Sequence, residues 1–77
     1  MAVTIIQDWT DAEVPLRPGT RRDVRYRVYR EGRQLFLEIR NPNDTPVHTL
    51  DIPDGMAMNQ RNYEVLLRFA LHNVHAA

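Results

Sequence analysis

Residues 23–40, "DVRYRVYREGRQLFLEIR", decide the fold, because apolar and polar residues alternate on both sides of a glycine. Alternation with a period of two is typical of a strand that buries one face. The Glu31-Gly32 pair suits a two-residue turn, in which positive φ favours glycine. Folding the chain at this pair gives a β-hairpin in which the numbers of facing residues sum to 63.

This register separates an apolar face from a charged one. The apolar pairs are Val24 with Ile39, Tyr26 with Leu37 and Val28 with Leu35. The other face pairs Asp23 with Arg40, Arg25 with Glu38, Arg27 with Phe36 and Tyr29 with Gln34. Two complementary charge pairs and one cation–π pair support the register, since facing side chains stabilise a sheet.

One further strand is expected on each side of this hairpin. Residues 3–9 are rich in β-branched residues and predict a first strand. Residues 10–22 predict an irregular connection, because Pro15 and the Pro18-Gly19 pair argue against a central strand. Pro42 predicts a type I turn, after which residues 45–52 form a last strand. Its inward set is Pro46, His48, Leu50 and Ile52, and its outward set is Val47, Thr49 and Asp51.

The last third of the chain changes to a helical period. Its apolar residues recur three and four positions apart, at Tyr63, Leu66, Leu67, Ala70, Leu71 and Val74. The helix is expected from about residue 59 to 75, with Asn59 or Asp54 as its N-cap. At ~1.5 Å per residue its length of roughly 25 Å matches a strand of seven or eight residues, so it should pack along the sheet.

The expected fold is therefore α+β, an antiparallel meander of three or four strands, with the central hairpin at residues 24–40, packed on one C-terminal helix. With 77 residues the chain should form a single domain, residues 1–77. The expected core is Ile5, Val24, Tyr26, Val28, Leu35, Leu37, Ile39, Leu50, Ile52, Leu66, Leu67, Ala70, Leu71 and Val74.

The composition argues against an enzyme. The chain has no Cys, Ser or Lys, which removes disulfides, thiolate metal sites and the usual serine and Schiff-base nucleophiles. His72 and His75 share a helix face but lack a third ligand, and His48 is expected as a core histidine. We therefore predict no catalytic residues, no cofactor and no metal.

The net charge is zero, with ten Arg against ten Asp plus Glu, so there is no global field that attracts nucleic acid or a membrane. The exclusive use of Arg as the basic residue suggests a GC-rich genome. The N-terminus has no basic start and only a short apolar run. These features favour a cytoplasmic accessory protein of bacterial or phage type, without membrane contact.

The helix has more apolar surface than one sheet contact requires. Val65 and Phe69 lie on the flank opposite Leu67 and Leu71. They either contact the first strand, Trp9 or the connection, or form an interface with another protein. A second candidate surface is the outer face of the hairpin, with Arg27, Tyr29 and Phe36. The leading hypothesis is a protein-protein interaction module that self-associates as a homodimer and acts as an adaptor or inhibitor of a larger macromolecule.

The arginines leave an alternative open. Residues 17–40 hold eight arginines and three acids. A basic ribbon with aromatic side chains could bind nucleic acid, through Arg17, Arg21, Arg22, Arg27, Arg30 and Arg33. Alternation of Arg with apolar residues is also what a strand with one solvated face shows, so the sequence does not decide between these interpretations.

Overall fold

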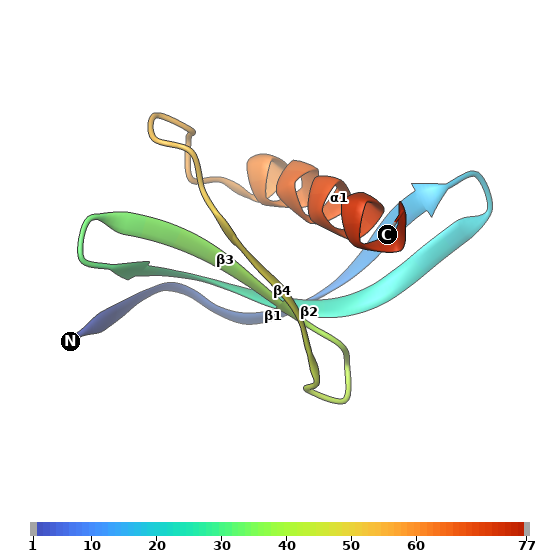
Figure 1. Cartoon of the computed structure of the whole chain (residues 1–77), viewed down its shortest axis with the longest axis horizontal. Coiled ribbons are helices and arrows are strands. Elements are labelled where there is room, and N and C mark those ends of the chain that lie inside the picture. Colours follow the sequence, from blue (N-terminus) through green and yellow to red (C-terminus); the bar gives the residue numbers. More distant parts are fainter. Residues whose placement is uncertain (1, 77) are drawn as a thin grey trace.

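The protein folds as one four-stranded antiparallel sheet with a helix on one face (Figure 1). A computed structural model describes residues 2–76, with side chains to His72. The elements are β1 (Val3–Arg17), β2 (Thr20–Glu31), β3 (Gln34–Arg40), β4 (Pro46–Asp51) and α1 (Gln60–Ala76), and the strand order is β1-β2-β3-β4. The expected α+β fold is confirmed.

Strand β1 is longer than the sequence predicted. Residues 10–17 continue the strand and pair with β2, so the irregular connection expected at residues 10–22 is wrong. The two strands join in a two-residue turn in which Arg17 faces Thr20 and Gly19 has φ +80°. Proline followed by a glycine of positive φ is the pattern of a type II turn. Pro15 is tolerated because β1 lies at the edge of the sheet.

The path of β1 is irregular, and its buried residues differ from those predicted. Its pairing with β2 shifts between Ile5 and Gln7, between Gln7 and Thr10, and again near Pro15. Ile5, expected in the core, is 44% exposed, because it faces Tyr29 on the side of the sheet away from the helix. Val14, which was not in the expected core, is buried there instead.

The central hairpin turns at Gly32-Arg33, one residue later than predicted. Tyr26 faces Ile39 and Val28 faces Leu37, so facing numbers sum to 65 and not to 63. Gly32 has φ +65° at the first turn position, as a type II′ turn requires. A shift of two keeps every side chain on its predicted face, because the strand period is two. The predicted apolar face is therefore correct, whereas the predicted cross-strand partners are wrong.

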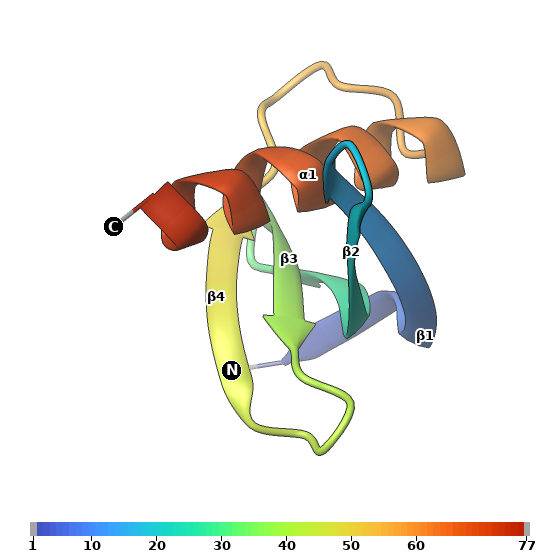
Figure 2. The ribbon, with the colours of Figure 1, turned by 90° about the vertical axis from the view of Figure 1, so that its right-hand side faces the viewer.

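Strand β4 contains a bulge that the sequence did not reveal. Ile39 faces His48 while Arg40 faces Pro46, which leaves Val47 as an extra residue. Val47, expected to point outward, packs against the core. His48, expected in the core, is exposed. Figure 2 shows the reason: α1 crosses the sheet near the end of β4, far from the start of that strand.

Helix α1 begins after Asn59, which is its N-cap: the backbone N–H of Asn62 donates to Asn59 Oδ1 at 2.9 Å. The helix crosses the strands and does not run along them as predicted (Figure 2). Within the described chain it is too short and too polar to cross a membrane. It covers the inner sheet face to form the core, which comprises Val14, Val24, Tyr26, Val28, Leu37, Ile39, Ile52, Tyr63, Leu66, Leu67, Ala70 and Leu71.

The remaining core predictions have mixed outcomes. Leu35 and Leu50 are only partly buried, because they lie at the margin of the face that the helix covers. Tyr63 was recognised as part of the helical stripe and is fully packed in the core. The side chains of Val74 and His75 lie outside the described residues.

Candidate interaction surfaces

The sheet face opposite the helix, called the outer face here, has an arginine cluster at its centre. The indole of Trp9 in β1 lies against three guanidinium groups, those of Arg25, Arg27 and Arg40, at 5.6, 5.0 and 5.1 Å from the ring centroid. Arg25 faces Arg40 directly across β2 and β3. Two like charges in facing positions repel each other. The Trp9 ring and nearby acids offset this repulsion.

Acidic side chains neutralise this cluster. Glu38, whose side chain is largely buried, accepts from Arg27 Nε at 2.8 Å and from Arg40 Nη2 at 3.1 Å. Arg25 contacts Asp11 Oδ1 at 3.5 Å. The partners predicted from the sequence, Glu38 for Arg25 and Asp23 for Arg40, are wrong because the register is shifted by two.

The loop between β3 and β4 adds one more acid. The Asp44 N–H donates to the Asn41 carbonyl at 2.8 Å and closes a turn with Pro42 at its second position. Asp44 then has φ 74°, a conformation that Asp adopts more readily than most residues. Its carboxylate reaches Arg25 at 3.6 Å and Arg40 at 3.3 Å. The three arginines thus face three carboxylates, and the cluster is locally neutral.

An apolar row lies beside the arginine cluster on the outer face. Ile5 faces Tyr29, and Tyr29 faces Phe36, so the row runs across β1, β2 and β3. The Tyr29 and Phe36 rings stack at 5.3 Å with an interplanar angle of 25°. Arg27 lies over Tyr29 at 5.1 Å, and not opposite Phe36 as predicted. Partial burial, followed by the charge of Glu38, raises the pKa of Tyr29.

The exposed flank of α1 forms a second surface. Val65 is 53% exposed and Phe69 is 64% exposed, one turn apart on the helix. Most of each side chain is in solvent, and Trp9 lies on the other side of the sheet. Val65 also lines a groove between α1 and β1, together with Glu13, Pro15, Arg61 and Arg68.

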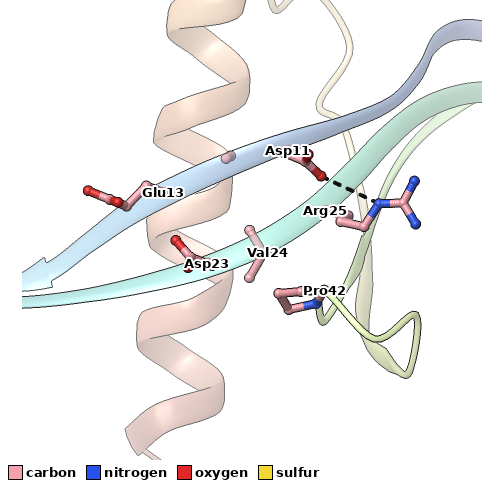
Figure 3. Close-up of a pocket in the computed structure, with 7 residues that line it drawn as sticks. Asp11, Glu13, Asp23, Val24, Arg25 and Pro42 are labelled. Carbon is pink, nitrogen blue, oxygen red and sulfur yellow. Dashed lines mark ion pairs between the residues drawn. The ribbon is translucent and has the colours of Figure 1, made fainter.

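Several carboxylates line a hollow on the outer face (Figure 3). It is lined by Asp11, Glu13 and Asp23, with Arg25 and Pro42 at its side. Two of these carboxylates already have basic partners, since Asp11 pairs with Arg25 and Glu13 with Arg21. Among the described residues, no three His, Asp or Glu side chains are placed to hold a metal ion.

The six arginines proposed for nucleic acid do not form one patch. Arg27 is occupied by Glu38, Arg21 pairs with Glu13, and Arg22 donates to Asn41 Oδ1 at 2.9 Å. Arg17 lies at the β1–β2 turn, whereas Arg30 and Arg33 lie at the β2–β3 turn. These turns are at opposite ends of the molecule (Figure 1). The arginines are thus divided between two ends and a neutralised centre.

The contact of Trp9 with the arginine cluster was not predicted from the sequence. The three arginines fit the alternating pattern of β2 and β3, but the pairing of β1 beyond Trp9 was needed to place the indole over them.

Comparison with known protein families, with curated proteins and with solved structures finds no match to this chain.

Proposed function

We propose that this protein acts by binding protein, that it self-associates, and that it serves as a small non-enzymatic adaptor or inhibitor of a larger macromolecule in a bacterial or phage cytoplasm. The observation that carries the proposal is the exposure of Phe69 and Val65 on a helix whose other side is fully packed. Exposed apolar side chains that cluster on a small domain are typical of protein contact sites.

The outer face of the sheet supports the same function. It presents Trp9, Tyr29 and Phe36 together with arginines whose charges are already neutralised. Aromatic and Arg side chains contribute most to protein interfaces. A surface for nucleic acid would need unpaired positive charge along one face, because phosphate contacts provide most of its affinity.

Size-exclusion chromatography with light scattering tests the proposal. At ~100 µM, well above the dissociation constant of a micromolar interface, we expect a mass twice the 9.0 kDa of one chain. A mass of one chain would contradict self-association. Phe69→Asp then decides whether the helix surface holds the dimer or is left for another protein. Thr49→Asp is the matched control, since it adds the same charge at an exposed position of β4 away from the helix flank.

A further inference from the structure

The two edges of the sheet differ in how they are protected against pairing with another strand. Strands β1 and β4 are the edges, so one side of each has no strand partner within the described chain. Free edges invite pairing, and proteins block them with charges, prolines, bulges or short strands. Strand β4 has three such blocks: it is six residues long, it begins at Pro46 and it bulges at Val47.

The C-terminal part of β1 is blocked as well. It presents the exposed carboxylates of Asp8, Asp11 and Glu13, and Pro15 lacks an N–H donor. The pairing shifts between Gln7 and Thr10 and near Pro15 disturb its geometry further. A second strand would meet repulsion and a broken hydrogen-bond ladder along this part of the edge.

Residues 3–6, "VTII", have fewer of these blocks, since the one irregularity here is the pairing shift at Ile6, between Ile5 and Gln7. They are uncharged, contain no proline, and are regularly paired with β2 up to Ile5. Val3, Ile5 and Ile6 are each more than 40% exposed, which makes this the most apolar stretch of the edge. Within the described residues, it is the open section of the sheet boundary.

We infer that residues 3–6 of β1 pair in antiparallel fashion with the same residues of a second copy of this chain, so that the two sheets join into one. This inference rests on the proposed self-association. It assigns that self-association to the strand edge, and leaves Val65 and Phe69 on the helix free for a different protein.

The pairing is self-complementary only near Thr4. A two-fold axis perpendicular to the sheet sets residues of the same face opposite each other, so Thr4 faces the partner's Thr4 and Val3 faces the partner's Ile5. Facing β-branched side chains stabilise an antiparallel pair. An axis at Asp8 or at Asp11 would instead set that carboxylate opposite the same carboxylate of the second copy.

This arrangement would also bury apolar area on the outer face. Ile5 is the first member of the apolar row with Tyr29 and Phe36. Joining two edges at Thr4 brings the apolar rows of both copies together and covers the exposed Val3 and Ile5 side chains. The interface therefore combines backbone hydrogen bonds with burial of apolar area, which is the usual mode of strand addition.

Cross-linking tests the geometry. The chain contains no cysteine, so Thr4→Cys introduces a single thiol. Facing Cα atoms in an antiparallel pair lie about 4.5–5.5 Å apart, within the range of about 4.4–6.8 Å that a disulfide spans. We expect Thr4→Cys to form a disulfide-linked dimer under mild oxidation. Thr49→Cys on the β4 edge is the matched control and should stay monomeric on a non-reducing gel. Equal linkage of both variants, or none for Thr4→Cys, would overturn the inference.

A charge variant separates this inference from the proposed function. Thr4→Glu sets the two introduced carboxylates opposite each other in the dimer, whereas within one chain each faces Arg30, so the fold is kept. We expect light scattering to show a monomer for Thr4→Glu and a dimer for Phe69→Asp, with unchanged circular dichroism. The reverse result would overturn the edge pairing but keep self-association through the helix. A monomeric wild-type chain would remove self-association itself.

Discussion

The hydroxyl of Tyr26 in β2 donates a hydrogen bond to Gln60 Oε1 at the start of α1, at 3.0 Å. The same hydroxyl accepts from Gln7 Nε2 of β1 at 2.9 Å, and Gln7 also donates to Thr10 Oγ1 at 3.1 Å. The Tyr26 ring is fully buried, and its centroid lies 6.2 Å from that of the Tyr63 ring. One buried side chain thus joins the edge strand, the central strand and the helix.

Removing the Tyr26 hydroxyl should weaken this junction. We expect Tyr26→Phe to lower the free energy of unfolding by about 0.5–1.5 kcal/mol, the typical net value of a hydrogen bond, because the ring still fills the core. Urea denaturation measures the change. Tyr29→Phe is the control, since the Tyr29 hydroxyl makes no hydrogen bond to any of the described residues. Equal losses in both variants would show that the junction contributes little.

Leu37 lies at the centre of the buried sheet face, opposite Val28 and Leu50. We expect Leu37→Ala to cost about 2–5 kcal/mol in unfolding free energy, because it removes transfer energy and leaves a cavity. Leu35→Ala is the matched control, since Leu35 is only partly buried and should cost less. A loss under about 0.5 kcal/mol for Leu37→Ala would contradict the packing described here.

Tyrosines control the stability at alkaline pH, because the chain has no Lys or Cys and arginine stays protonated. Burial, followed by the neighbouring Tyr26, raises the pKa of Tyr63 above its ordinary value of 10.0. Above pH 10 the unfolded chain therefore loses this proton before the folded chain does. The contribution of Tyr63 to the free energy of unfolding is complete below pH 10, and it is lost as the pH rises through the pKa that Tyr63 has in the folded chain.

The free energy of unfolding should accordingly fall as the pH rises above 10. Urea denaturation at several pH values measures the slope. Tyr63→Phe should make the slope less steep, because the substituted ring does not ionise, while Tyr29, whose pKa is also raised, keeps its part of the slope. The same slope in Tyr63→Phe and in wild type would show that another tyrosine is responsible.

The sequence predicted the fold where the local pattern was sufficient. Alternation in residues 23–40 identified the buried face, and the correct face survived a turn placed one residue early, because the error in register was even. The helical stripe likewise identified Leu66, Leu67 and Leu71 as core residues.

The candidate surfaces were less predictable, because they depend on contacts between distant strands. Trp9 could not be placed over Arg27 until β1 was known to continue through Pro15 to Arg17. His48 follows the core pattern and is nevertheless exposed, because the crossing of α1 determines which end of the sheet is covered. Bulges in β1 and β4 leave no clear mark in the sequence, and the bulge in β4 moved Val47 inward.

The division of the arginines leads to a last prediction, on nucleic acid. Binding through phosphates requires several free cations along one surface, and each neutralised phosphate steepens the dependence on salt. Here Arg27 is bound by Glu38, Arg21 and Arg22 have their own partners, and the remaining candidates lie at opposite ends of β2. We expect micromolar protein to leave single- and double-stranded oligonucleotides unshifted in a gel at ~50 mM salt, where phosphate contacts are strong.

Glu38→Gln is a useful comparison, because it frees the positive charges of Arg27 and Arg40 and should increase any residual binding. A salt-sensitive shift by the wild-type chain, reduced by Arg30→Ala and Arg33→Ala together, would instead show that the β2–β3 turn binds nucleic acid.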